Sequence, residues 1–179
     1  ILSEFKIKTT FYIASDMIGG EKPFWVDEIE SCLNATELDE ITLSLGNQCN
    51  FKLDNLNNKI EALAKIKLFC KNTDNHTKNE VLEDLKKITN VNPSNNDCKN
   101  YQIMNWNEVR ELSNDDQFII GGHSLSHEIL SSLDKNEMRE NISRSISDIE
   151  FNIKKKVLHY SYPEGQENHF NDDVINVLK

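Results

Sequence analysis

The sequence predicts an α/β fold with parallel strands. Strand-like runs and amphipathic helical patterns follow one another along the chain, and this alternation is typical of parallel α/β architecture. Two runs rich in β-branched, aromatic and aliphatic residues, 6–13 and 117–121, are predicted to be buried strands, and the second leads into Gly121-Gly122. At 179 residues the chain is long enough for one domain with a sizeable core, and we identify no linker that divides it.

A helix and a hairpin are predicted after the first strand. Apolar residues recur at helical spacing from Phe24 to Leu33, and Trp25 on that face is expected in the core rather than as a platform for a sugar ring. Residues 37–53 show an alternating pattern around the turn signal Gly46-Asn47, which predicts a β-hairpin.

Two further helices are predicted from their N-terminal signals. Asp54 is expected to cap a helix over 55–70, with an apolar stripe at 56, 60, 63, 66, 69 and 70. The sequence Thr77-Lys78-Asn79-Glu80 has the form of a capping box and predicts a helix that ends near Thr89. The Asn-rich segment 90–100 is expected to be a loop.

Capping signals also begin the helices on either side of the second strand. Asn105 is followed three residues later by Glu108, and together they predict a short helix. Asp134 and Glu137 have the same spacing and predict a long amphipathic helix. The buried stripe of this long helix is expected at Met138, Ile142, Ile146, Ile149 and Ile153.

A strand over 157–162 and a helix over 172–178 are predicted at the end of the chain, separated by Pro163-Glu164-Gly165. His159 lies in the middle of the predicted strand and is expected to be a hydrogen-bonded core or barrel-lining residue. His169 is expected at the surface, with a contact to substrate as the alternative.

Composition excludes some classes of partner. Hydrophobic residues make up 37% of the chain, charged residues 28%, and the net charge is −10. No basic block is longer than 154–156, so a surface that follows nucleic-acid phosphates is not expected. No apolar run approaches the roughly 18 residues of a membrane span, and the lack of a recognisable leader peptide favours the cytoplasm.

The four cysteines, Cys32, Cys49, Cys70 and Cys98, are widely spaced. No pair has the C-x-x-C spacing of common zinc sites, so reduced thiols are expected rather than a disulfide framework. A zinc site built from these four is the less favoured alternative.

The strongest signal of chemistry is the histidine pair that follows Gly121-Gly122. His123 and His127 are four residues apart, a spacing that places two side chains on one face of a helical turn, where they can hold one metal ion. Functional side chains of α/β folds gather just beyond the carboxyl ends of strands. The alternative is a pair of solvated histidines on a helix surface.

The segment from Gly121 to His127 resembles the second motif of the polysaccharide deacetylases. Three other segments resemble parts of this family and occur in the family's order. Thr10-Phe11-Tyr12-Ile13 resembles the strand that follows the first motif, and residues 106–112 resemble the helix that precedes the histidines. Residues 160–165 resemble the third motif and are called the third-motif segment below. These proteins are metal-dependent carbohydrate esterases with a distorted β/α barrel. The resemblance implies an incomplete (β/α) barrel, one deacetylase-like domain over 1–179, and a mainly helical insertion at 24–100.

The resemblance also implies a site and a reaction, the removal of N- or O-acetyl groups from a sugar or polysaccharide. His123 and His127 would be ligands of a divalent metal ion, with Zn²⁺ expected, although nickel, cobalt and iron fit similar ligands. Ser124 would support the turn by hydrogen bonding, and the backbone N–H of Glu164 would stabilise the oxyanion. The pocket wall that contacts the substrate would comprise Tyr162, Pro163 and Gly165.

Departures from the family pattern suggest an alternative function. The first motif, Thr-Phe-Asp-Asp, is expected before residue 1 and the last histidine motif after residue 179, so the base and the third ligand are not expected among these residues. Ser161 stands where the family usually carries Arg. These 179 residues alone are therefore expected to be inactive.

The alternative is a non-catalytic binding or regulatory module on the same scaffold. An incomplete barrel exposes a strand edge and apolar surface, which would favour pairing with another chain and so an oligomer. In that case Glu128, or an acid from a partner, would replace the missing carboxylate ligand.

Overall fold

The computed structural model describes residues 2–20, 23–94 and 102–179. The chain folds into two compact units. The first unit comprises Ile1–Gly20 and Ile103–Lys179, and the second comprises Glu21–Gln102.

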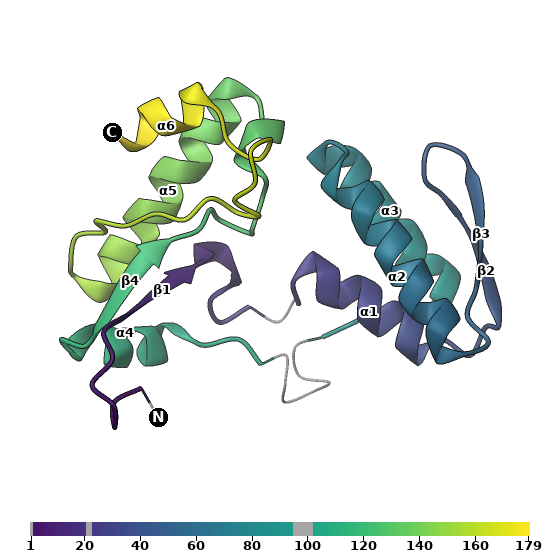
Figure 1. Ribbon diagram of the computed structural model, residues 1–179, viewed down its shortest axis with the longest axis horizontal. Coiled ribbons are helices and arrows are strands. Elements are labelled where there is room, and N and C mark those ends of the chain that lie inside the picture. Colours follow the sequence, from purple (N-terminus) through teal and green to yellow (C-terminus); the bar gives the residue numbers. More distant parts are fainter. Residues whose placement is uncertain (1, 21–22, 95–101) are drawn as a thin grey trace. The chain divides into compact units, whose positions relative to one another are not determined.

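The first unit is built on a pair of parallel strands, β1 (Thr9–Ile13) and β4 (Phe118–Gly122). Thr9 pairs with Phe118 and Ile13 with Gly122, so both strands end at the same edge of the sheet (Figure 1). The described residues of this unit form helices and a small sheet but no closed barrel. The expected fold class is therefore correct as α/β, whereas the barrel geometry is not seen.

The strand predicted over 157–162 is wrong. Tyr160 makes one isolated parallel bridge to Gly122, through hydrogen bonds of Gly122 N–H to His159 O and of Ser161 N–H to Gly122 O. A strand needs a longer ladder, and β4 ends at the residue to which this bridge is made. The strand-like residues 157–162 therefore run as extended backbone beside β4 for one step only.

Helices of the first unit begin where their capping signals predict. Asn105 caps α4 (Trp106–Asn114) in a capping box with Glu108, and Asp134 caps α5 (Lys135–Ile153) in a second box with Glu137. The final helix, α6 (Asp172–Leu178), also agrees with the prediction. Two 3₁₀ turns, η1 (Ser15–Met17) and η3 (Leu130–Ser132), follow β1 and the histidines respectively.

One face of the two-stranded sheet is buried and the other is partly exposed. Ile13 and Ile120 lie on the buried face, where they pack with residues of α4 and α5: Val109, Ile149 and Ile153. Tyr12 and Ile119 lie on the other face and are 42% and 39% exposed. A second apolar cluster joins α5 to α6 through Leu130, Met138, Ile142 and Val174, and Ile146 is partly buried against it.

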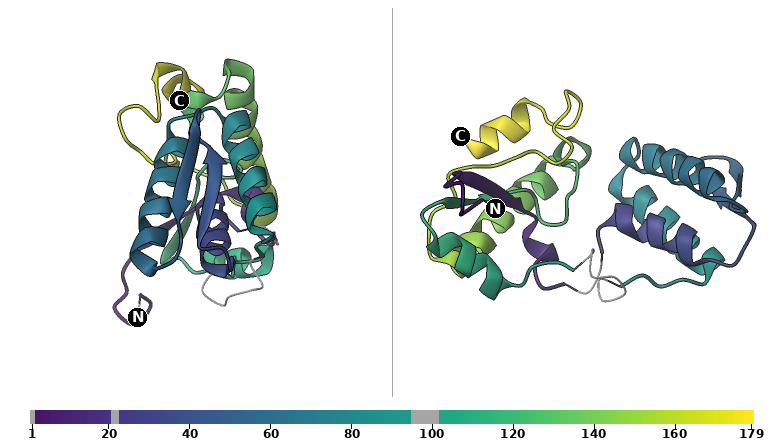
Figure 2. Two further views of the ribbon diagram at one scale, coloured as in Figure 1. Left: turned by 90° about the vertical axis from the view of Figure 1, so that its right-hand side faces the viewer. Right: turned by 60° about the horizontal axis from the view of Figure 1, so that its bottom comes forward.

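The described residues of the second unit form three helices and the predicted hairpin. The hairpin consists of β2 (Glu40–Ser44) and β3 (Gln48–Lys52), and it lies along the helices (Figure 2). The helices are α1 (Trp25–Ala35), α2 (Leu56–Lys71) and α3 (Asn75–Thr89).

Two predicted helix starts in the second unit are wrong, by one residue for α2 and by three residues for α3. Asn55, not Asp54, caps α2, because its side chain accepts the Asn58 N–H. Asp74 caps α3, because its carboxylate accepts both the N–H and the hydroxyl of Thr77. Thr77 therefore lies inside the first turn rather than before it.

The apolar stripe predicted for α2 is wrong in part, because the residues of this helix that face the core of the second unit are partly different ones. Ala62, Ile66 and Cys70 are buried, whereas Leu56 and Ile60 are 68% and 54% exposed. Trp25 packs against this core, as expected. Cys32, Cys49 and Cys70 are free thiols, and Cys98 lies outside the described residues.

The expectation of one deacetylase-like domain over 1–179 with an insertion at 24–100 stays a prediction. Among the helices that the structure describes, none has the length and apolar composition needed to cross a bilayer.

Candidate metal centre

The two predicted metal ligands lie on a loop and not on a helix. The histidine loop, residues 123–128, leaves β4 directly and forms an irregular turn. Ser124 and His127 have φ angles of 62° and 65°, in the left-handed region that a right-handed helix does not use. The predicted helical turn is therefore wrong.

The loop nevertheless brings the two imidazoles together. The ring centroids of His123 and His127 are 4.8 Å apart, with an angle of 69° between the ring planes. Nδ1 of His123 lies 2.9 Å from the carbonyl oxygen of Ser161. Because a carbonyl oxygen can only accept, we assign the hydrogen to Nδ1, which leaves Nε2 of the neutral ring as the nitrogen with a free lone pair. Metal-binding histidines commonly have this second hydrogen bond.

Electrostatics favour the neutral form of His127. Burial lowers the pKa of His127, and the neighbouring His123 lowers it further. The negative charges of Glu164 and Glu128 act in the opposite direction but do not reverse the shift. A neutral imidazole is the form that can bind a metal ion.

Ser124 is fully buried in the centre of the loop. Its Oγ accepts the Glu128 N–H at 3.0 Å, and its own N–H donates to the Tyr160 hydroxyl at 2.8 Å. Burial raises the pKa of Tyr160, so this hydroxyl stays protonated at neutral pH. Ser124 therefore closes the loop on one side and attaches it to Tyr160 on the other.

The next residue attaches the loop to α5. Leu125 N–H donates to Oδ1 of the buried Asn141 at 3.1 Å, and Leu125 O accepts the Asp16 N–H at 2.9 Å. No role at this site was predicted for Asn141 or Tyr160 from the sequence. A signal for Asn141 was present, because this polar residue lies among the buried apolar positions of α5, next to Ile142.

Close packing explains the glycine pair before the loop. A Cβ on Gly122 would stand 2.6 Å from the Tyr160 ring, and one on Gly121 would stand 2.6 Å from the Tyr12 ring and 2.9 Å from His159 O. Only glycine allows these contacts.

The third-motif segment reaches the histidines through Ser161, whose carbonyl binds His123. Pro163 is fully buried, and Tyr162 stacks on Phe170 with ring centroids 4.5 Å apart. Glu164 and Gly165 follow with φ angles of 61° and 62°, and Gly165 N–H donates to Pro163 O. The roles predicted for Tyr162, Pro163, Glu164 and Gly165 in catalysis and substrate binding stay predictions.

The donor set fits a transition-metal ion in part. Two imidazoles in contact suit Zn²⁺, but among the described residues no group of three His, Cys, Asp or Glu side chains could hold a metal ion. Glu128, the predicted substitute ligand, uses Oε2 to accept the Ser126 N–H. The metal and its identity stay predictions.

The remaining histidines of the first unit lie outside this pair. His159 is exposed, which contradicts its predicted place in the core or barrel lining, because residues 157–162 do not enter a sheet. His169 is half-buried, and its Nδ1 accepts the Gln166 N–H at 3.4 Å.

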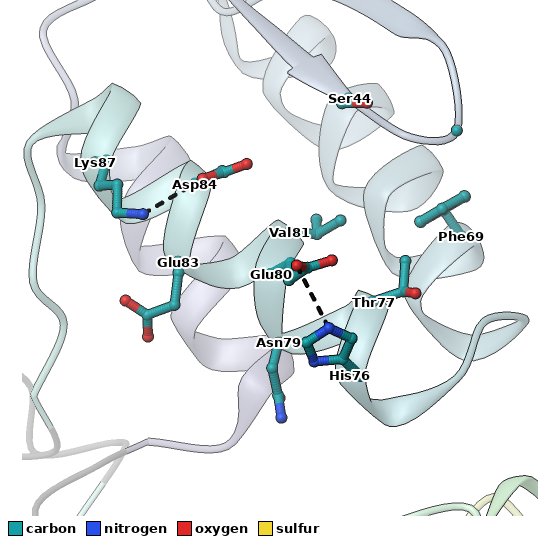
Figure 3. Close-up of a pocket in the computed structure, with 11 residues that line it drawn as sticks. Ser44, Phe69, His76, Thr77, Asn79, Glu80, Val81, Glu83, Asp84 and Lys87 are labelled. Carbon is teal, nitrogen blue, oxygen red and sulfur yellow. Dashed lines mark ion pairs between the residues drawn. The ribbon is translucent and has the colours of Figure 1, made fainter.

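A hollow of about 630 Å³ lies in the second unit, between the hairpin turn and α3 (Figure 3). His76 pairs with Glu80 and Lys87 with Asp84, both at 3.5 Å, and all four side chains are more than half exposed. Exposed ion pairs of this kind are well solvated. The hollow is thus an open, solvated surface, and no predicted site residue lies in it. Its lining consists of Ser44, Gly46, Phe69, His76, Thr77, Asn79, Glu80, Val81, Glu83, Asp84 and Lys87.

Comparison with known proteins identifies the family. The family model described as polysaccharide deacetylase matches residues 68–179, more than half of the chain. The match takes in both histidines and the third-motif segment but not β1, and it begins inside α2. Searches of curated proteins and of solved structures found no match. The chain belongs to the polysaccharide deacetylase family, whose members act on acetylated carbohydrates.

Proposed function

We propose that this protein is a metal-dependent hydrolase that removes N- or O-acetyl groups from a sugar or polysaccharide. The observation that carries the proposal is the contact between the His123 and His127 rings, 4.8 Å apart, directly after a parallel strand. In this proposal both imidazoles bind one divalent ion, with Zn²⁺ the expected metal.

The hydrogen bond to Ser161 supports the role of His123. It holds Nδ1, so that Nε2 is the nitrogen available to the ion. The lowered pKa of His127 supports its role, because protons compete less with the ion for this nitrogen. When bound, the ion would act as a Lewis acid toward the acetyl carbonyl and lower the pKa of water.

The substrate would bind beside the third-motif segment. We infer that Tyr162, Pro163 and Gly165 form the wall of the sugar site and that the Glu164 backbone N–H donates to the developing oxyanion. The support is the link from Ser161 to His123 and the influence of the Glu164 charge on His127, which together indicate that this segment is close to the rings. Residues 24–100 would be an insertion in this deacetylase domain.

A second candidate function is a non-catalytic binding or regulatory module. The observation that favours it is that the described residues include no group of three His, Cys, Asp or Glu side chains that could hold a metal ion. The exposed sheet face with Tyr12 and Ile119 is where another chain would pack in such a module. Gel filtration tests whether the chain associates in this way. A stable oligomer at low protein concentration supports the binding module, and a monomer counts against it.

Zinc binding tests the site. The Zn²⁺ affinity of the purified chain is measured by competition with a chromophoric chelator. The variants His123→Ala and His127→Ala are measured in the same way. We expect one equivalent of binding in the unchanged chain and at least a tenfold weaker affinity in each variant. His76→Ala is the matched control, because His76 is exposed in the second unit. Binding that is unchanged in both loop variants would refute the site.

Acetate release tests the reaction. The zinc-loaded chain is incubated with an N-acetylglucosamine oligomer and with an O-acetylated polysaccharide. Release that is lost in both histidine variants supports the hydrolase. Sugar binding without any release supports the binding module.

A further inference from the structure

The histidine loop is held by hydrogen bonds to its backbone rather than by helical structure. Of the three N–H groups between the two histidines, that of Ser126 donates to Glu128 within the loop, which leaves those of Ser124 and Leu125. Each donates to a side chain from elsewhere in the first unit, the Tyr160 hydroxyl and the Asn141 amide. A buried N–H without such an acceptor is costly, so these acceptors determine which loop conformation is stable.

We propose that Asn141 and Tyr160 are positioning residues, which hold the peptide between His123 and His127 in the conformation that brings the two imidazoles together for a metal ion. This inference rests on the proposed metal site. It concerns two side chains that touch neither imidazole in any described hydrogen bond.

Asn141 is suited to this role by its rigidity. It is 7% exposed on α5, between Met138 and Ile142 of the buried apolar cluster. A buried amide in a helix that packs this tightly has few alternative rotamers. Oδ1 is the acceptor because the Leu125 N–H can only donate.

Tyr160 is fixed at both ends of its side chain. Its ring lies against Gly122, and its hydroxyl accepts the Ser124 N–H. The same hydroxyl is 3.5 Å from Oγ of Ser145, a fully buried residue of α5 that donates to Ile142 O. Both anchors of the loop therefore lead to α5, since Asn141 belongs to it directly and Tyr160 reaches it through Ser145.

The left-handed backbone of Ser124 explains why anchors are needed. A serine with a φ of 62° is in a conformation that costs free energy for a residue with a Cβ. The hydrogen bonds on both sides of Ser124 offset this cost. Without them we expect the loop to relax toward ordinary backbone angles, which would separate the two rings.

Variants of Asn141 test the inference with two readouts. Asn141→Leu removes the acceptor and keeps the branched shape of the side chain, whereas Asn141→Asp keeps an oxygen for the Leu125 N–H. Asn152→Leu is the matched control, because Asn152 lies on the same helix and bonds Arg110 and Asp148, not the loop. In the metal-free chain, NMR records the cross-peaks between the His123 and His127 rings, and competition with a chelator then gives the Zn²⁺ affinity.

We expect Asn141→Leu to lose the ring–ring cross-peaks and to bind Zn²⁺ about tenfold more weakly, the range seen for outer partners of metal ligands. Asn141→Asp and Asn152→Leu should retain the ring–ring cross-peaks and the Zn²⁺ affinity of the unchanged chain. Unchanged cross-peaks and affinity in Asn141→Leu would overturn the inference, and so would equal losses in Asn141→Leu and Asn152→Leu, which would show a structural effect alone.

Two further outcomes are decisive. If Asn141→Leu does not fold, Tyr160→Phe replaces it, because this variant removes the acceptor of the Ser124 N–H and keeps the ring. Unchanged ring–ring cross-peaks and unchanged Zn²⁺ affinity in Tyr160→Phe would overturn the inference. If the unchanged chain binds no Zn²⁺, the proposed metal site fails. The cross-peaks of the metal-free variants then still decide whether Asn141 and Tyr160 position the rings.

Discussion

Cδ2 of the Tyr160 ring lies 2.6 Å from the place that a Cβ on Gly122 would occupy. Heavy atoms that are not bonded do not approach so closely, so the ring and the last residue of β4 fit together only because that residue is glycine. The same tyrosine accepts the Ser124 N–H. The end of the strand, the tyrosine and the start of the histidine loop therefore depend on one another.

Gly122→Ala should lower the free energy of unfolding by about 1–3 kcal/mol, because the added methyl group overpacks the contact with the Tyr160 ring. Urea denaturation measures this change. The double variant Gly122→Ala with Tyr160→Leu, in which the smaller side chain leaves room, should be less destabilised than the two single effects added together. Strict additivity would contradict the proposed clash.

Stability should decrease in mild acid because of His127. Burial and then His123 lower its pKa in the folded chain, whereas the unfolded chain takes up this proton near the ordinary value of about 6.5. The unfolded chain thus binds more protons in the window below about 6.5, and the free energy of unfolding falls as the pH is lowered through it. His127→Gln should reduce this pH dependence. NMR titration of the metal-free chain gives the pKa of His127, and a midpoint at or above 6.5 would contradict the expectation.

Cys70 should resist alkylation while the second unit is folded. Burial raises the pKa of its thiol to about 11, so almost no reactive thiolate forms at pH 8. Cys49 is the internal control, because it is only partly buried. Mass spectrometry after brief treatment with iodoacetamide should find Cys49 modified before Cys70, and urea should remove the difference. Equal rates in the folded chain would show that the second unit opens readily.

Asn105→Ala should destabilise the first unit by about 1 kcal/mol, because Asn105 accepts the N–H groups of Asn107 and Glu108 at the start of α4. Asn105→Ser keeps an acceptor oxygen and should cost much less. Thermal or urea unfolding of both variants measures the difference. Equal stability of the alanine and serine variants would mean that the cap contributes little.

Predictions from the sequence succeeded where the determining contacts are local. The capping boxes at Asn105 and Asp134 join residues three positions apart, and both are confirmed. The hairpin is also confirmed, since its turn and its alternation lie within a few residues of each other. The predicted cap of α2 failed narrowly, because Asp54 and Asn55 offer similar acceptors and it is the Asn55 side chain that accepts the Asn58 N–H.

The helical turn at His123–His127 failed for a different reason. Local spacing favours one helical face, but the acceptors of the loop come from Tyr160 and Asn141, 36 and 16 residues away. The strand predicted over 157–162 failed likewise, because its residues have strand propensity but find only one pairing step beside β4.

By itself the sequence determined the family, the order of most helices and strands, and which histidines meet. Their spacing keeps the two imidazoles within reach of each other in almost any compact turn. Only the tertiary structure decided how they meet, through a loop with left-handed residues whose N–H groups are paired with α5 and Tyr160. The physical reason is that a buried N–H must find an acceptor, and which acceptor lies within 3 Å or so depends on contacts between segments far apart in the chain.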